Sequence, residues 1–350
     1  GQGGNDKIDG LSGNDLLRGG AGNDTLLGGE GNNTLDGGTG DDRLNVDSLP
    51  GNNLLSGGDG NDYLSTSGYQ NTNYPDGEDL RSSGNNTLNG GAGDDNLNAS
   101  GSTGNNLLSG DDGNDSLSIS GYYQGNDYFN NDSRSSGNNT LNGGAGNDNL
   151  SASGSAGNNL LSGGDGNDSL SISGYYSYTP NQDPYEPRNL SLTYDSRSLG
   201  NNTLNGGTGD DRLNASGSTG DNLLSGGDGN DILIGGNGND SLYGGSGTDT
   251  FAFNSYNKHG VDSLYDFNAT NELIQVSAAG FGGGLSPGSL QTSQLIIGTL
   301  ATTSEERFIY NSATGGLFFD LDGSASGFTQ VKFAQLSAGL SLTENNFVVV

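Results

Sequence analysis

The sequence predicts an all-β protein: a parallel β-roll (β-solenoid) of about 21 nine-residue windows, followed by a β-rich C-terminal cap. A nine-residue unit recurs from Gly1 to Ala252, and the copy at 19–27 reads GGAGNDTLL. The eighth position of every window is apolar, from Ile8 through a row of Leu to Phe251. A fixed period with one buried position per unit is typical of a solenoid. The composition then changes, with less Asn and more Phe, Ile and Val over residues 253–350.

Each unit divides into a turn and a short strand. Five or six residues of Gly, Asn and Asp form the turn, and three residues centred on the apolar position form the strand. Gly permits positive φ, so main-chain oxygens in such a turn can point toward a common centre. Calcium prefers six to eight oxygen ligands, which carboxylates and carbonyls supply. A row of Asp at the sixth position, in register with a row of Leu, therefore favours calcium as the ligand.

The turns read GGAGND at 19–24, GGTGDD at 37–42, GGDGND at 57–62 and GGNGND at 235–240. This unit resembles the nonapeptide G-G-x-G-x-D-x-U-x of the RTX (repeats-in-toxin, haemolysin-type) calcium-binding proteins. The resemblance implies that two windows make one coil, so that successive turns fall on opposite edges of the roll. It also implies that calcium, the expected cofactor, lies between turns two windows apart, held by Asp carboxylates and main-chain oxygens.

The sixth position differs between alternate windows. In the first, third and every further odd-numbered window it is always Asp, and these residues are the expected metal ligands: Asp6, Asp24, Asp42, Asp62, Asp95, Asp115, Asp148, Asp168, Asp211, Asp231 and Asp249. In the windows between them it is mostly Asn: Asp15, Asn33, Asn53, Asn86, Asn106, Asn139, Asn159, Asn202, Asn222 and Asp240. We call the first set the Asp edge and the second the Asn edge; Asp15 and Asp240 are additional candidate ligands on the Asn edge.

The two edges are expected to differ in calcium binding. The eleven turns of the Asp edge offer ten gaps for ions. An Asn amide oxygen is a weaker ligand for a hard cation than a carboxylate, so we expect the Asn edge to be largely ion-free. Amide-to-amide and amide-to-backbone hydrogen bonds would hold it together. The alternative is that the Asn turns also bind calcium, less tightly, through their carbonyl groups.

Three long insertions interrupt the repeat, at 66–80, 119–133 and 172–196, and each lies between an Asp-edge window and the next Asn turn. They should therefore emerge on the side of the Asn turns. They hold ten of the fifteen Tyr: Tyr69, Tyr74, Tyr122, Tyr123, Tyr128, Tyr175, Tyr176, Tyr178, Tyr185 and Tyr194. Two interpretations remain open: loops that bind polysaccharide or another surface, and drifted repeats whose Tyr cover the flank of the roll.

Residues 253–350 are expected to cap the roll, because an open solenoid exposes strand edges. The predicted strands are Ser263–Phe267, Glu272–Val276, Gln294–Ile297, Arg307–Tyr310, Gly316–Asp320 and Gln330–Leu336. The junction GGSGTDTFAF at 244–253, followed by DSLYDF at 262–267, resembles that of serralysin-type secreted proteins. The stretch ending FFDLDG at 323 is similar to the region after RTX repeats in cyanobacterial proteins. The final ENNFVVV at 344–350 resembles a type I secretion signal and also fits a last β-strand.

The chain has a net charge of −31, 67 Gly and no Cys. This composition resembles that of an acidic disordered polymer. Ten divalent ions would reduce the charge to −11, so calcium binding and folding should be coupled. Sites of about millimolar affinity load outside the cell, which predicts an extracellular protein. The resemblance of residues 344–350 to a type I secretion signal implies export by the type I secretion machinery. The negative charge argues against nucleic acid as a partner. The sequence contains no run of 18 apolar residues, so no transmembrane segment is predicted.

The sequence gives little support for catalysis. His259 is the only His, which excludes the two-His zinc motif H-E-x-x-H within this chain. The match to G-x-S-x-G at 284–288 contains Pro287 and has no later His, so it is not expected to form a nucleophile elbow. The first prediction is therefore a secreted, calcium-binding, non-enzymatic roll. The alternatives are the C-terminal portion of a larger RTX enzyme or toxin, since the chain begins within a motif, and an adhesin that binds polysaccharide, a cell surface or ice.

Overall fold

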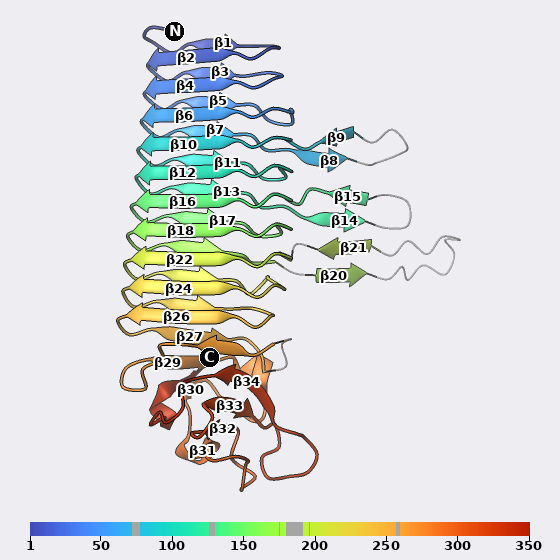
Figure 1. Cartoon of the computed structure of the whole chain (residues 1–350), viewed down its shortest axis with the longest axis vertical. Coiled ribbons are helices and arrows are strands. Elements are labelled where there is room, and N and C mark those ends of the chain that lie inside the picture. The colour runs from blue at the N-terminus through green and yellow to red at the C-terminus, as the bar shows by residue number, and fades with distance from the viewer. Residues whose placement is uncertain (72–77, 126–129, 175, 180–191, 196, 257–259) are drawn as a thin grey trace, which may run out of the picture.

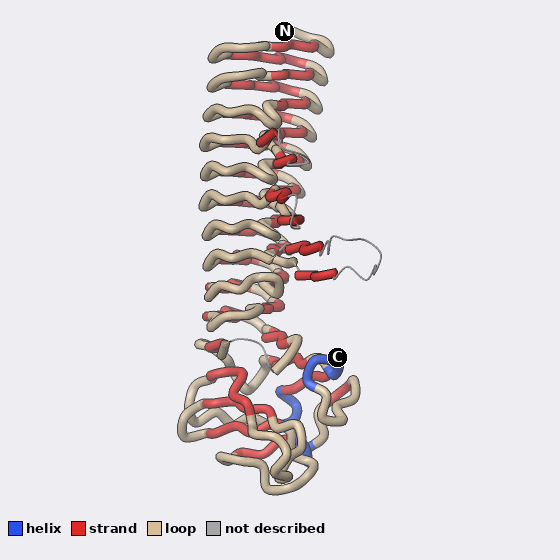
Figure 2. The backbone as a smooth tube through the Cα atoms, turned by 90° about the vertical axis from the view of Figure 1, so that its right-hand side faces the viewer, coloured by secondary structure: helices blue, strands red, loops and turns tan. Residues whose placement is uncertain are grey.

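The computed structural model describes residues 1–350 except 72–77, 126–129, 175, 180–191, 196 and 257–259. The chain winds into a long column in which each coil adds one strand to each of two facing sheets (Figure 1). Seen from the side, the coils are stacked evenly from the N-terminus to a more irregular region at the C-terminal end (Figure 2). This is the parallel β-roll that the nine-residue period predicts.

One sheet is built mainly of three-residue strands, and we call it the short-strand sheet. Its order is β1 (Lys7–Asp9), β3 (Thr25–Leu27), β5 (Arg43–Asn45), β7 (Tyr63–Ser65), β11 (Asn96–Asn98), β13 (Ser116–Ser118), β17 (Asn149–Ser151), β19 (Ser169–Ser171), β23 (Arg212–Asn214), β25 (Ile232–Ile234), β27 (Thr250–Phe253), β29 (Leu273–Val276), β35 (Phe347–Val349) and β30 (Gly288–Ser289). All neighbours pair in parallel except β35 and β30.

The other sheet is built mainly of six-residue strands, and we call it the long-strand sheet. Its order is β2 (Leu16–Ala21), β4 (Thr34–Thr39), β6 (Leu54–Asp59), β10 (Thr87–Ala92), β12 (Leu107–Asp112), β16 (Thr140–Ala145), β18 (Leu160–Asp165), β22 (Thr203–Thr208), β24 (Leu223–Asp228), β26 (Ser241–Ser246), β28 (Asp262–Leu264), β34 (Val331–Gln335), β33 (Gly316–Phe319), β32 (Phe308–Asn311) and β31 (Leu295–Ile297). Pairing is parallel from β2 to β34, and antiparallel between β34, β33 and β32.

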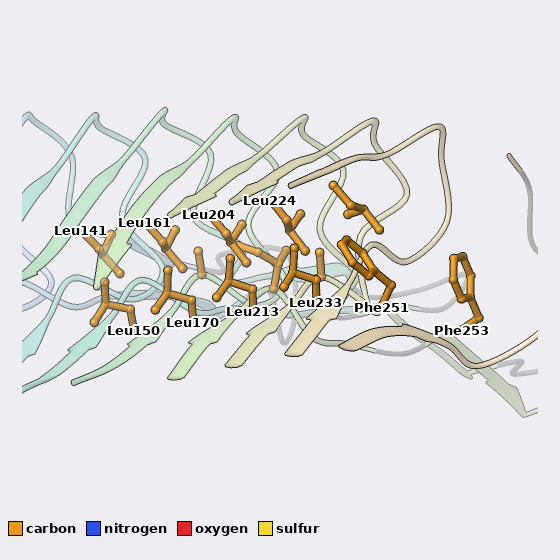
Figure 3. Close-up of a cluster of buried hydrophobic side chains, with 14 of the residues drawn as sticks. Leu141, Leu150, Leu161, Leu170, Leu204, Leu213, Leu224, Leu233, Phe251 and Phe253 are labelled. Atoms are coloured by element: carbon orange, nitrogen blue, oxygen red, sulfur yellow. The ribbon is translucent and has the colours of Figure 1, made fainter. Parts of the chain in front are cut away.

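The core of the roll consists of two facing rows of Leu. Pairing places equivalent positions above one another, so Leu150 aligns with Leu170 in one sheet and Leu141 with Leu161 in the other. These side chains are fully buried and meet between the sheets (Figure 3). Each fully buried Leu stabilises the fold by about 1.5–3 kcal/mol. The apolar eighth position of each window is therefore what joins the two sheets.

Glycine is required where consecutive coils approach each other most closely. At Gly164, φ is +114° and an added Cβ would lie 2.0 Å from the carbonyl oxygen of Gly144 in the preceding coil. Any side chain there would combine a strained backbone with a steric clash. The Gly pair of the repeat therefore sets the spacing of the coils as well as the shape of the turn.

The long insertions form antiparallel hairpins that project from one side of the column (Figure 1). They are β8 (Tyr69–Asn71) with β9 (Glu78–Leu80), β14 (Tyr123–Gly125) with β15 (Asn130–Asp132), and β20 (Tyr176–Thr179) with β21 (Leu192–Asp195). Each follows a strand of the short-strand sheet and returns before an Asn turn, so the hairpins lie on the side of the Asn edge. Strand β14 also pairs with β21, which joins the second and third hairpins into one four-stranded sheet.

The C-terminal end of the column is closed by the strands β28 to β35 and a cluster of aromatic side chains. The six strands predicted from the sequence correspond to β28, β29, β31, β32, β33 and β34. The short strand β30 and the single-turn helix α1 (Ala278–Phe281) were not anticipated. The ring of Phe281 lies 5.1 Å from that of Phe319 and 5.3 Å from that of Phe333.

The change of composition at residue 253 does not coincide with the end of the parallel pairing. Strand β28 pairs in parallel with β26, and β29 pairs in parallel with β27. The parallel pairing of the two sheets thus continues past the boundary expected at residue 253, because pairing needs only extended backbone and an apolar residue that points inward. Leu264 and Ile274 supply that residue in these strands.

Candidate calcium-binding edges

The eleven Asp of the Asp edge form one column. They lie in the turns that lead into the short-strand sheet, one above the other. From Asp6 to Asp231, the backbone N–H of each Asp donates to Oδ1 of the Asp in the next coil, at 2.7–2.9 Å. These ten hydrogen bonds fix the carboxylates of the ten Asp from Asp24 to Asp249 in the same orientation, and they align all eleven predicted ligands in one column.

The second carboxylate oxygen has no hydrogen-bond partner in ten of these eleven residues, although it is buried. These oxygens are the Oδ2 atoms of Asp24, Asp42, Asp62, Asp95, Asp115, Asp148, Asp168, Asp211, Asp231 and Asp249. A buried oxygen without a partner is costly, and its repetition along the column indicates a donor set that suits a cation rather than an irregularity of one coil.

A carbonyl oxygen of the next coil lies beside the unpartnered carboxylate. A Cβ placed on Gly163 would lie 2.0 Å from Asp168 Oδ2 and 2.6 Å from the carbonyl oxygen of Gly206. The corresponding distances at Gly19 are 2.3 Å to Asp24 Oδ2 and 2.5 Å to the carbonyl oxygen of Gly37. The absence of a side chain at the first Gly thus leaves a small space bordered by oxygens from two coils, which suits calcium.

The carboxylates provide at most part of the coordination shell. Within the described residues, no three His, Cys, Asp or Glu side chains converge as a metal-binding group. The remaining ligands of a calcium ion in each gap would therefore be main-chain oxygens of the Gly-rich turns.

Burial raises the pKa of the stacked carboxyls. It raises the pKa of Asp62, Asp95 and Asp211 to about 7, and that of Asp115 and Asp168 to about 6. The N–H donated by the preceding Asp opposes this rise, and repulsion from neighbouring Asp adds to it. Without a cation, the ionised column therefore destabilises the fold near neutral pH.

The Asn edge satisfies its own polar groups. The Nδ2 of Asn106 donates to the carbonyl oxygen of Gly104 at 3.0 Å and to Oδ1 of Asn139 at 2.9 Å. Asn139 repeats this arrangement with Gly137 at 2.8 Å and with Asn159 at 3.0 Å. These are the amide-to-backbone and amide-to-amide bonds that the sequence predicts.

The amide nitrogen is the physical difference between the edges. All eight Asn at the sixth position donate from Nδ2 to a turn carbonyl, which on the Asp edge would be free to bind a cation. An ionised carboxylate has only acceptor oxygens and needs a cation nearby, whereas an Asn amide also carries an N–H donor that can bond the turn carbonyl.

The two Asp of the Asn edge lie near its ends. Asp15 has an unpartnered Oδ2, and a Cβ on Gly10 would lie 2.7 Å from this atom and 2.6 Å from the carbonyl oxygen of Gly28. The first turn of this edge thus repeats the geometry of the Asp edge. Asp240 Oδ1 accepts from both the N and the Nδ2 of Asn222, at 2.8 and 2.9 Å.

Two acidic residues beyond the repeat continue the two columns and were missed in the sequence. Asp262 follows Asp240, whose N–H donates to Asp262 Oδ1 at 3.3 Å. Glu272 follows Asp249 and is 3% exposed. Asp262 was detectable, because Gly260, Asp262 and Leu264 keep three positions of the unit. The turn before Glu272 has no Gly and gives little signal.

The Tyr-rich insertions form a second surface. Tyr123 and Tyr176 carry an Arg guanidinium over the ring, at 5.3 Å for Arg134 and 4.8 Å for Arg197. Arg197 also forms an ion pair with Asp195 at 2.8 Å. Tyr74, Tyr128, Tyr175 and Tyr185, like His259, lie outside the described residues.

Ser286 of the G-x-S-x-G match lies in a loop between α1 and β30, which is not the strand-turn-helix of a nucleophile elbow.

Comparison with known proteins gives a family for the repeat. The profile of the RTX calcium-binding nonapeptide repeat matches nine segments, at 1–35, 18–48, 45–68, 82–101, 98–118, 135–154, 151–171, 198–218 and 216–251. No curated protein matches the chain. No helix among the described residues is long and apolar enough to cross a membrane.

Two solved structures are similar in part. One is the solution structure of the AlgE6R3 subunit of the Azotobacter vinelandii mannuronan C5-epimerase, with 26% identity, a TM-score of 0.30, and coverage of 43% of this chain and 78% of that one. The other is the extracellular lipase LipA of Serratia marcescens, with 19% identity, a TM-score of 0.20, and coverage of 77% of this chain and 40% of that one. The matched segments span more than half of the present sequence, and the chain belongs to the family of RTX calcium-binding nonapeptide repeat proteins.

Proposed function

We propose that this chain is a secreted calcium-binding protein whose roll folds when extracellular calcium fills the gaps of the Asp edge. The observation that carries the proposal is the column of ten buried Oδ2 atoms without hydrogen-bond partners. The ligands would be Asp6 and the ten Asp that follow it along the column to Asp249, with turn carbonyls completing each site. Asp15 would add one site at the start of the Asn edge.

The remainder of the Asn edge would need no ion. Apart from Asp240, its sixth-position residues are Asn, whose amides already donate to the carbonyls that would otherwise bind the cation and which bring no negative charge. An ion entering there would have to displace two hydrogen bonds per turn without gaining a carboxylate ligand. This supports a roll with calcium along one edge.

The compartment follows from the coupling of binding and folding. A chain with a net charge of −31 that folds only when its sites fill would remain loose where calcium is scarce. Extracellular modules bind calcium at about 0.1–1 mM, so the roll would fold after export. A loose chain also suits export by the type I secretion machinery, for which the C-terminal residues 344–350 are the proposed signal.

Counting the bound ions tests the proposal. Isothermal calorimetry of the full chain, together with anomalous scattering from crystals grown in calcium, should give ten to twelve ions. Their positions should follow the Asp column and Asp15. Full-occupancy ions along both edges would contradict the one-edge arrangement, and no bound calcium would contradict the function itself.

A second candidate function is binding of polysaccharide or another cell-surface polymer by the hairpins. It is favoured by the pairing of β14 with β21, which joins two separate insertions into one projecting sheet that carries Tyr123 and Tyr176 (Figure 1). A glycan-binding screen of the folded chain should find ligands whose binding is lost in Tyr176→Ala. Binding that survives this substitution would place the contact elsewhere.

A further inference from the structure

The last gap of the Asp edge lies beyond the final repeat. Strand β29 forms the next coil after β27, and Leu273 N donates to the carbonyl oxygen of Asp249 at 2.9 Å. One coil earlier, Thr250 N makes the same bond to the carbonyl oxygen of Asp231 at 2.8 Å. Glu272 therefore occupies the position that Asp holds in the eleven coils before it.

Asp249 directs an unpartnered oxygen into this gap. The residue is 0% exposed, its Oδ1 accepts from Asp231 N at 2.9 Å, and its Oδ2 has no partner. In the preceding coil, a Cβ on Gly226 would lie 2.1 Å from Asp231 Oδ2 and 2.5 Å from the carbonyl oxygen of Gly244. The second oxygen of Asp231 thus faces the following coil. At the next Gly of this column, a Cβ on Gly244 would lie 2.4 Å from Asp249 Oδ2, and Gly244 N donates to Oδ1 of Asp266 in the following coil at 2.9 Å.

Glu272 completes the gap with a second buried carboxylate. It is 3% exposed, and its Oε2 accepts from Asn268 N at 2.7 Å. Within the described residues, neither Glu272 nor Asp249 forms an ion pair with Lys or Arg. The turn before Glu272 lacks the Gly residues of the repeat, and the extra methylene of Glu gives the carboxylate a longer reach from it.

We propose that Asp249 and Glu272 bind a divalent cation, calcium in the extracellular medium, in a site outside the RTX repeats. This inference rests on the proposed calcium binding of the Asp edge. The two carboxylates would supply the charged ligands, and main-chain oxygens of the adjoining turns the others. Because β29 pairs with β35, this ion would tie the C-terminal strand to the roll.

Glu272→Gln provides a sharp test, because Gln keeps the size of the side chain and an oxygen that can accept from Asn268 N–H. The matched control is Glu305→Gln, which removes the same charge from an exposed position in the C-terminal region. Hydrogen exchange of the full-length proteins, measured over a calcium series, reports protection of the strands 250–253, 273–276 and 347–349 separately from 96–118.

We expect Glu272→Gln to raise the calcium concentration for half-protection of the C-terminal strands by at least about tenfold, the lower range for disturbing a metal site. Asp249→Asn should act in the same direction, and the 96–118 region should change little. An unchanged midpoint in Glu272→Gln, equal to that of Glu305→Gln, would overturn the site and leave Glu272 as a buried neutral acid. Protection of the wild-type roll that is independent of calcium would overturn the proposed function instead.

Discussion

Acidification should stabilise the calcium-free roll and so replace part of the effect of calcium, because protons neutralise the buried carboxyls of the Asp edge. Burial in the folded roll raises the pKa of nine Asp of the column, those from Asp42 to Asp249, above the ordinary value of 3.8 that they regain on unfolding. The calcium-free roll therefore binds protons more tightly than the unfolded chain does. The loss of folding free energy caused by ionising these buried carboxyls is absent below about pH 3.8. It grows as the pH rises and is complete above about pH 7.

The size of the effect can be worked out for single residues. For a carboxyl whose pKa rises from 3.8 to about 7, as for Asp62, Asp95 and Asp211, lowering the pH from 7.5 to 5 recovers about 2–3 kcal/mol. For Asp115, Asp168 and Asp231, with a pKa of about 6, it recovers about 1 kcal/mol each. Together this is on the order of 10 kcal/mol, comparable with the whole stability of a typical domain.

The assay is far-UV circular dichroism of the full chain, freed of calcium by dialysis, over pH 7.5 to 5. The β-signal should rise as the pH falls, with its midpoint between 5 and 7, and adding calcium at pH 7.5 should give the same spectrum. A calcium-free chain whose spectrum does not change over this range, or which loses β-signal on acidification, would refute the reasoning about the buried carboxyls.

Point substitutions test the other parts of the architecture. Asp115→Asn should raise the calcium midpoint of folding more than Asn106→Ala does, because only the first removes a charged ligand; equal shifts in a calcium titration would count against two different edges. Leu150→Ala should lower the free energy of unfolding by about 2–5 kcal/mol in urea at saturating calcium, whereas Leu160→Ala, which truncates a side chain that is 42% exposed, should cost much less. Gly164→Ala should destabilise the roll because its Cβ would clash with the preceding coil; wild-type stability would show that the coils can separate there.

Much of the roll could be predicted because the repeat encodes it locally. Leu150 and Leu170 occupy the same position of the unit, so their stacking follows once the period is recognised. The contrast between Asp115 and Asn106 follows in the same way, since the position fixes the edge and the side chain decides between an unpartnered oxygen and a donated N–H.

The rest depends on contacts between distant segments that no local pattern encodes. Strand β14 pairs with β21 across more than sixty residues, although nothing in either insertion marks its partner. Glu272 joins the Asp column because β29 adds to the short-strand sheet, while its own turn has lost the Gly residues of the unit. Helix α1 is a single turn capped by Ser277, too short for a periodic pattern to reveal.

The most direct test of the whole account is a calcium titration of the purified chain at pH 7.5, followed by circular dichroism. Stacked buried carboxylates predict a disordered spectrum in chelator and a cooperative gain of β-signal near millimolar calcium. A chain that remains fully structured after exhaustive chelation would contradict the claim that cations between the coils hold this roll together.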